Sequence, residues 1–221
     1  MMRVLIIGAS GGIGAALATE AEARGAEVTR LSRRIDGLDV TSEASVADHL
    51  GRLKGAFDAI WVATGALEIG AHGPEKALRD LSPDALAQQF ALNATGPALV
   101  LKHAAHLLPR RGRPTFAALS ARVGSIGDNR AGGWYAYRAS KAALNQIVRC
   151  AAIELGRTHR DLICVALHPG TVATPFTEKY LGRHPAVPPQ EAAQNLWSVL
   201  DGLTPAQTGG FYDWAGKEVA W

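Results

Sequence analysis

A glycine-rich turn directly after the first apolar run constrains this chain more than any other feature. The run Arg3–Ile7 is typical of a short buried parallel strand, and Gly8, Gly11, Gly12 and Gly14 follow it. Glycine lets the backbone turn sharply and approach a ligand closely, and the start of the next helix offers free N–H groups. This order predicts a pyrophosphate site. The spacing G-x-x-x-G-x-G is not the common G-x-G-x-x-G, and a turn needed only for packing is the alternative.

Strand-like and helix-like segments alternate from one end of the chain to the other, with no repeat and no break in composition. We expect strands at 3–7, 27–31, 57–63, 115–119, 162–167 and 210–214, a further short one near 37–40, and helices at 13–23, 45–53, 82–108 (kinked at Pro97), 135–155 and 190–200. Such alternation predicts one domain over 1–221, a single-domain α/β Rossmann fold. Its doubly wound parallel sheet would have about seven strands and helices on both faces. The irregular stretches 65–79, 120–133 and 174–189 follow strands, where such a sheet places its ligand crevice.

The composition excludes several other classes of protein. The chain has 221 residues, 48% of them hydrophobic, which is unlike a disordered chain and ample for a core. Its net charge of +3 is scattered, so we expect no nucleic-acid partner. The apolar runs are too short for a bilayer and no spacing suits metal ligands, so we expect no membrane association and no metal. Cys150 and Cys164 lie in apolar stretches, which favours buried thiols and a cytoplasmic location.

Two arginines follow the second expected strand, where a dinucleotide site contacts the adenine ribose. An NAD site usually has Asp or Glu here, whereas a guanidinium suits the 2′-phosphate of NADP. Arg33 and Arg34 therefore predict NADP over NAD, with Arg33 as the main contact. The alternatives are that both arginines are solvated loop charges, or that Asp36 binds the ribose.

Tyr137 and Lys141 lie one helical turn apart near the start of the helix expected over 135–155, so they share a face. A free tyrosine has a pKa of about 10, and a neighbouring ammonium is expected to lower it. The phenol would then protonate a carbonyl oxygen as hydride arrives, or act as the base in the reverse reaction. Because Y-x-x-x-K is a common spacing, a chance pair on an amphipathic helix is the alternative.

Together with Tyr137 and Lys141, residues along nearly the whole chain resemble the motifs of one family. The short-chain dehydrogenase/reductases share Gly8, Gly12 and Gly14, the segments 39–40 and 62–65, Asn93, Tyr137 with Lys141, the segment 169–172 and Thr174. The segments 124–126 and 132–141 resemble more narrowly the C-factor-like and Sniffer-like carbonyl reductase branch.

The resemblance implies a cofactor site and a homodimer, or a tetramer, formed by the helices expected over 82–108 and 135–155. In it, Asp39 and Val40 would flank the adenine, and the segment from Pro169 would cover the nicotinamide. The cofactor-binding residues it implies are Gly8, Ser10, Gly12, Ile13, Gly14, Arg33, Asp39, Val40, Ala63, Gly65, Tyr137, Lys141, Pro169, Gly170, Val172 and Thr174.

The resemblance also implies a catalytic set of Tyr137, Lys141, Asn93 and a serine. Asn93 would hold a water that links Lys141 to solvent. The family commonly has Ser-Ser after this strand, and the second serine orients the substrate. Here the pair is Ser120-Ala121, so Ser120 stands one residue early and is expected on the opposite face of the strand. Ser125 is a second candidate, and a third arrangement uses no serine.

The sequence thus predicts an NADPH-dependent oxidoreductase that reduces a small-molecule carbonyl (aldehyde, ketone or quinone) to an alcohol. Val62-Ala63-Thr64-Gly65 replaces the usual Asn-Asn-Ala-Gly, and with the missing second serine it fits a rival, a weakly catalytic dinucleotide-binding sensor of C-factor type. A nucleotide-sugar epimerase ranks last, because those chains are usually longer. The same resemblance implies that the segment after Thr174 forms a lid over the substrate, and this segment is short. Trp134, Phe176 and Tyr180 are candidate apolar contacts there or core residues.

Overall fold

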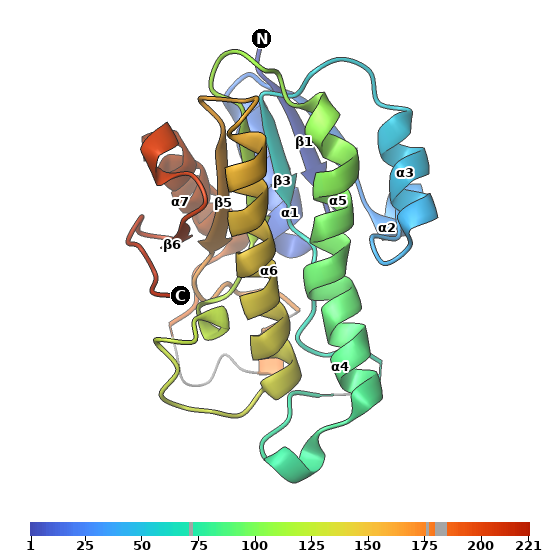
Figure 1. The fold of residues 1–221 in the computed structure, drawn as a ribbon, viewed down its shortest axis with the longest axis vertical. Helices are drawn as coiled ribbons and strands as arrows, with labels where there is room; N and C mark the ends of the chain where they lie inside the picture. Colours follow the sequence, from blue (N-terminus) through green and yellow to red (C-terminus); the bar gives the residue numbers. More distant parts are fainter. Residues whose placement is uncertain (71–72, 176, 180–184) are drawn as a thin grey trace.

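A parallel sheet with helices on both faces forms the centre of the protein (Figure 1). The structure is a computed structural model that describes residues 1–70, 73–175, 177–179 and 185–221. The strands lie in the order β2-β1-β3-β4-β5-β6, and each adjacent pair is parallel. Their bounds are β1 (Arg3–Ile7), β2 (Glu27–Leu31), β3 (Ala59–Val62), β4 (Thr115–Leu119), β5 (Ile163–His168) and β6 (Phe211–Asp213). The predicted fold class is confirmed.

The expected number of strands is wrong, because the described sheet has six strands and not about seven. The segment near 37–40 forms a turn instead of a strand. The carboxylate of Asp39 accepts hydrogen bonds from the backbone N–H and the hydroxyl of Thr41, at 2.9 and 2.7 Å. Such local bonds from an aspartate favour a turn over an extended ladder. Leu38 and Val40, whose alternation suggests a strand, are buried in the core on either side of Asp39.

The helices form two layers, one on each face of the sheet (Figure 1). Helices α1 and α7 pack together on one face, where Trp197 contacts Trp61 of β3 edge-on at 5.0 Å. Helices α3, α5 and α6 cover the other face, with α4 beside α6. The bounds are α1 (Gly12–Ala23), α2 (Arg33–Asp36), α3 (Glu43–Gly51), α4 (Pro83–Phe90), α5 (Gly96–Ala104), α6 (Tyr135–Leu155) and α7 (Pro189–Gly202).

The helix expected over 82–108 is interrupted before Pro97. A π-helical turn over Ala91–Thr95 separates α4 from α5, and a 3-10 turn over Ala105–Leu107 ends the segment. Pro97 has no N–H to give the carbonyl of Asn93, four residues earlier, and its ring crowds that carbonyl. The helix widens there, and Asn93 is fully buried at the widened turn. The interruption therefore places a polar side chain inside the fold.

The two cysteines differ in their surroundings. Cys164 of β5 is buried, as expected, but Cys150 on α6 is exposed, which corrects the expectation of two buried thiols. Position 150 lies on the outer face of α6, so its apolar neighbours in the sequence do not enclose it.

In the part of the chain that the structure describes, no helix is both long and apolar enough to cross a bilayer.

Candidate active site

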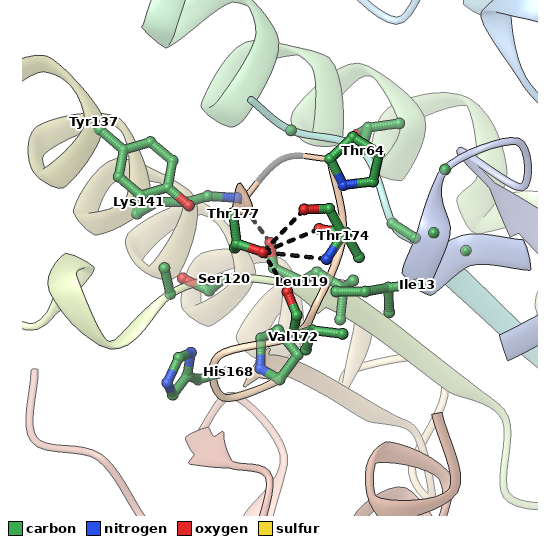
Figure 2. A pocket seen from close by; sticks show the side chains of 18 of the residues that line it. Ile13, Thr64, Leu119, Ser120, Tyr137, Lys141, His168, Val172, Thr174 and Thr177 are labelled. Carbon is green, nitrogen blue, oxygen red and sulfur yellow. Dashed lines mark hydrogen bonds between the residues drawn. The ribbon is translucent and has the colours of Figure 1, made fainter. Parts of the chain in front are cut away.

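A cavity of about 340 Å³ opens at the carboxyl ends of the central strands (Figure 2). Its walls come from the turn before α1, from the segments that follow β3, β4 and β5, and from the first turns of α6. Twelve of the predicted site residues are among those that line it. They are Ser10, Gly12, Ile13, Gly14, Ala63, Gly65, Ser120, Tyr137, Lys141, Pro169, Val172 and Thr174.

The glycine turn packs so tightly that larger residues would not fit. A Cβ at Gly14 would lie 2.2 Å from the carbonyl oxygen of Gly8, and one at Gly12 would lie 2.7 Å from Cγ2 of Thr174. Gly8 is not among the residues that line the cavity, and its N–H donates to the carbonyl of Leu31 at the end of β2. Gly11, Gly12 and Gly14 therefore border the cavity with no side chains over their amides, which is the arrangement that binds a pyrophosphate. The described residues fit a dinucleotide at this turn.

Tyr137 and Lys141 both reach the cavity from α6, as the spacing predicts (Figure 2). The Lys141 ammonium lies 5.9 Å from the centre of the Tyr137 ring and donates to the carbonyl of Leu119 at 2.9 Å. Both side chains are buried, with 7% and 3% of their surface exposed. The phenol and the ammonium thus lie together, with the ammonium attached to the end of β4.

The expected direction of the tyrosine pKa is wrong in this structure. Burial raises the pKa of Tyr137 above its ordinary value, and burial lowers the pKa of Lys141 to about 7. The physical cause is the same for both, since a low-dielectric site disfavours whichever form is charged. The phenol is therefore held in its protonated form. A protonated phenol is a proton donor, so the geometry suits an acid more directly than a base.

The first turn of α6 is fixed by a residue that the sequence analysis missed. Glu75 accepts a hydrogen bond on its backbone carbonyl from the N–H of Trp134 at 2.6 Å, and its carboxylate accepts from the N–H of Ala136 at 3.2 Å. Trp134, just before the helix, has a φ of 52°, in the left-handed region. A carboxylate at a helix N-terminus is favourable for the free N–H groups there. Glu75 therefore positions the helical turn that carries Tyr137.

Asn93 is attached to the loop after β3 and borders Lys141. Its amide donates to the carbonyl of Ala66 at 2.9 Å and accepts from the N–H of Ala66 at 3.0 Å, and it also donates to Gln89. Gly65 lies between the two side chains, because a Cβ there would be 2.9 Å from Oδ1 of Asn93 and 3.3 Å from Nζ of Lys141. The predicted neighbours thus lie together, while a water held by Asn93 stays a prediction.

Ser120 lines the cavity, but its hydroxyl is used inside the protein. It donates to Oδ1 of Asn145 at 2.6 Å, and Asn145 lies on α6 one turn beyond Lys141. Strand alternation places Ser120 on the side of the sheet that α6 covers. Its contact with a substrate carbonyl stays a prediction and would need the hydroxyl to turn. Ser125 is buried, accepts from the N–H of Asp128 and is not among the residues that line the cavity.

The predicted residues of the adenine end lie outside the cavity lining. Arg33 is exposed at the start of α2 and close enough to Asp39 to help lower its pKa, although the hydrogen bonds from Thr41 lower it most. Val40 packs beside Gly96 at the start of α5. The rival ligand, Asp36, accepts hydrogen bonds from the N–H and hydroxyl of Ser32 at 2.8 and 3.2 Å. Arg33 is therefore the freer of the two candidates for the ribose.

The segment after β5 closes the cavity on another side. Val172 pairs with Val187 in an isolated parallel bridge, and the hydroxyl of Thr177 donates to the carbonyls of Val172 and Thr174. Gly170 packs against Trp214, whose Cδ1 would be 2.9 Å from a Cβ there. The Trp134 ring contacts that of Tyr137 edge-on at 6.4 Å. Phe176 and Tyr180, the other candidate apolar contacts, lie outside the described residues.

Two further polar side chains of the cavity were missed by the sequence analysis. Among the described residues, neither Oγ1 of Thr64 nor Nδ1 of His168 has a hydrogen-bond partner, although both atoms are shielded from solvent. The sequence signal that could have identified His168 is its position directly before Pro169, at the end of an expected strand. Ligands bind at the ends of the strands in such a sheet. Within the described ranges no cluster of His, Cys, Asp and Glu has the arrangement of a metal site.

Comparison with known proteins gives relatives along the whole chain. A family model described as enoyl-(acyl carrier protein) reductase matches residues 30–201. The 1-hydroxy-2-glutathionyl-2-methyl-3-butene dehydrogenase of Rhodococcus sp. (strain AD45) is 31% identical, and the match covers 100% of both chains. The protein named C-signal from Myxococcus xanthus is 34% identical over 72% of this chain and 96% of its own.

Solved structures agree with these relatives. A short-chain dehydrogenase/reductase from Burkholderia multivorans, crystallised with bound NADP, has a TM-score of 0.81 and 27% identity, covering 100% of this chain and 99% of that one. A carbonyl reductase from Pseudomonas aeruginosa PAO1 has a TM-score of 0.80 and 25% identity, covering 100% of both chains.

Proposed function

Because the chain belongs to the short-chain dehydrogenase/reductase family of oxidoreductases, we propose that it uses NADPH to reduce a carbonyl group to an alcohol. The substrate would be a small aldehyde, ketone or quinone. The observation that carries the proposal is the buried phenol of Tyr137, which burial holds in its protonated form. It lies next to Lys141, and both side chains line the same cavity as the glycine-rich turn. NADPH supplies the hydride when bound.

Each residue of the site has a distinct part in this reaction. Tyr137 gives its phenolic proton to the substrate oxygen as the carbonyl carbon receives hydride. The hydride and the proton together convert the carbonyl to an alcohol. Lys141 stabilises the phenolate left behind by its charge. Asn93, attached to Ala66 beside Lys141, would hold the water through which the proton is returned. Ser120 would orient the substrate once its hydroxyl turns from Asn145.

NADP preference is part of the proposal and rests on the end of β2. Arg33 is exposed there, and the carboxylate of the rival ligand Asp36 already accepts hydrogen bonds from Ser32. A guanidinium pairs well with a phosphate, whereas the two hydroxyls of NAD would leave it without an anionic partner. The relative from Burkholderia multivorans, crystallised with NADP, supports the same cofactor.

The experiment that tests the function follows the loss of NADPH absorbance with a panel of aldehydes, ketones and quinones. We expect turnover by the parent protein and a loss of a hundredfold or more in Tyr137→Phe, on the order seen for a general acid. Tyr135→Phe is the matched control, because Tyr135 lies on the same helix and does not line the cavity. Parent rates in Tyr137→Phe would refute the mechanism.

A second candidate is a dinucleotide-binding sensor with little catalysis. Ala121 stands where the family commonly has its second serine, and the likeness to C-signal favours this candidate. The same panel separates the two. NADPH binding by fluorescence without turnover of any substrate would favour the sensor.

We also propose a homodimer, or a tetramer, and a cytoplasmic location. The outer face of α5 and α6 carries a groove lined by Ala98, Leu101, Lys102, Ala105, Gln146, Ile147, Cys150, Ala151, Glu154 and Leu155. Seven of these ten residues are apolar, and a mostly apolar helix face is typical of interfaces between copies. Sedimentation of the protein across a range of concentrations measures the number of copies.

A further inference from the structure

His49, on α3, contacts two backbone carbonyls that belong to different helices. Its Nδ1 lies 2.8 Å from the carbonyl oxygen of Ser45, one turn earlier on α3. Its Nε2 lies 2.9 Å from the carbonyl oxygen of Asp36, the last residue of α2. Figure 1 shows α2 and α3 side by side at the edge of the molecule. The imidazole therefore attaches the end of α2 to α3.

The two carbonyls require a proton on both ring nitrogens of His49. A carbonyl oxygen only accepts hydrogen bonds, and a neutral imidazole has a single N–H, so the neutral ring can donate to one of the two. The lone pair of its other nitrogen would then face a carbonyl oxygen, which is repulsive. The imidazolium satisfies both contacts. Accordingly, the carbonyl of Asp36, followed by that of Ser45, raises the pKa of His49 above its ordinary value of 6.5.

The charged side chains around His49 act on it in opposite directions and have partners of their own. Asp48 raises the pKa of His49 and Arg52 lowers it, and these two residues of α3 form an ion pair at 2.6 Å. The carboxylates of Asp36 and Asp39 accept hydrogen bonds within their own turns. The titratable groups at the opposite end of α3, where α5 contacts it, are Glu43, Lys102 and His103. The two carbonyls are therefore the main influence on the charge of His49.

The contact bears on the cofactor because α2 carries Arg33. This helix has four residues, a single turn, so its position depends on what holds its two ends. At the first end, the hydroxyl of Ser32 accepts a hydrogen bond from a backbone N–H of the turn, and at the other end His49 holds the last carbonyl. Helix α3 also holds the next segment, since the hydroxyl of Ser45 accepts from the N–H of Asp39 at 3.0 Å. Loss of the His49 contact would loosen the turn that presents Arg33.

We propose that His49 is a positioning residue for the cofactor: its charged form holds α2 so that Arg33 meets the 2′-phosphate, and affinity for NADPH falls as His49 loses its proton. This inference rests on the proposed use of NADPH. Because the pKa is raised in the folded protein, the contact is complete below pH 6.5 and is lost as the pH rises through the higher value. His49 acts through Arg33, so the affinity for NADH, which has no 2′-phosphate, should not depend on it.

Fluorescence titrations at pH 6 and pH 8.5 compare the Kd for NADPH of the parent with that of His49→Gln, which carries no charge. We expect the variant to bind about threefold to tenfold more weakly at pH 6, as for the loss of one hydrogen bond, and about equally at pH 8.5. Ionisation of the 2′-phosphate, with a pKa of about 6, affects both proteins alike and cancels in this ratio.

Two further variants show whether the charge of His49 is responsible. His49→Arg keeps a permanent charge and several N–H donors, so it should bind NADPH like the parent at pH 6 and more tightly than the parent at pH 8.5. His106→Gln is the matched control, because His106 is an exposed histidine on another part of the chain, and it should match the parent at both pH values. The same ratio of His49→Gln to parent at both pH values would overturn the proposal, as would equal weakening of NADPH and NADH.

A second measurement follows the charge of His49 directly. NMR titration of its ring in the protein without cofactor should give a pKa above 6.5, and a value at or below 6.5 would overturn the proposal. Neither measurement depends on turnover. If no carbonyl is reduced but the Kd ratio changes with pH as expected, the reductase proposal fails and the role of His49 stands. If carbonyls are reduced but the ratio is constant, the role of His49 is wrong and the proposed function stands.

Discussion

Replacing Lys141 with methionine is expected to make the stability of the protein less dependent on pH. Lys141 is 3% exposed, and burial lowers its pKa from 10.5 to about 7. The ammonium donates to the carbonyl of Leu119, which keeps it at the end of β4. Methionine has a similar length and no charge, so the variant removes the buried charge while filling the space.

The size and sign of the effect follow from the lysine pKa in the two states. A fall from 10.5 to about 7 corresponds to about 5 kcal/mol of unfavourable free energy when the folded protein must carry the charge. Below pH 7 both states hold the proton, so the full cost is present. Between pH 7 and 10.5 only the unfolded chain holds it, so stability rises with pH and the cost declines. At pH 9 about 2 kcal/mol remains.

Urea unfolding without cofactor, at pH 6 and at pH 9, measures this difference. We expect the free energy of unfolding of Lys141→Met relative to the parent to be about 3 kcal/mol higher at pH 6 than at pH 9. Loss of the hydrogen bond to Leu119 costs about 1 kcal/mol at both pH values, so it cancels in the comparison. Lys54→Met is the matched control, because Lys54 is exposed, and it should show no such dependence.

The same free-energy change at both pH values would refute the argument, because it would mean that Lys141 carries no charge penalty in the fold. Greater stabilisation at pH 9 than at pH 6 would also refute it, since only a raised lysine pKa gives that sign. Reductase activity should be lost in Lys141→Met in either case, so stability is the informative measurement.

Three further substitutions test other parts of the site. Gly65→Ala should lower the free energy of unfolding by about 1–3 kcal/mol in urea, because its φ is +150° and the new Cβ would lie 2.9 Å from Oδ1 of Asn93; Gly73→Ala, in open space, should not. Arg33→Ala should raise the Kd for NADPH about tenfold or more in a fluorescence titration and leave NADH unchanged, and equal weakening of both would contradict its contact with the 2′-phosphate. Ser120→Ala should lower kcat/KM about tenfold or more if its hydroxyl turns to the substrate, whereas an unchanged value would remove it from the reaction.

The parts of the site that the sequence predicts are those set by local spacing. The strand, turn and helix around Gly8 and Gly14 occur where expected, because glycine spacing and a short apolar run determine them over a few residues. The common face of Tyr137 and Lys141 follows from a spacing of four in a helix. These features need no knowledge of what packs against them.

The parts that the sequence does not predict depend on distant segments. Glu75 contacts the start of α6, and Ser120 donates to Asn145, so each pair joins residues well separated along the chain. The missing seventh strand has a local cause, since the alternating Leu38 and Val40 fit a strand but Asp39 turns the chain at Thr41. A periodic apolar pattern indicates burial, but does not distinguish a strand from a buried turn.

The error in the tyrosine pKa has a consequence for the direction of the reaction. A spacing shows that an ammonium is near the phenol, but not that both are buried, and here burial dominates for both groups. Alcohol oxidation needs a phenolate as base, which this site disfavours. Carbonyl reduction needs a phenolic proton, which the site retains, and the charge of Lys141 matters only after that proton has left. The burial that makes Lys141 costly to the fold therefore favours Tyr137 as an acid, and the same physical cause supports reduction as the direction proposed for this enzyme.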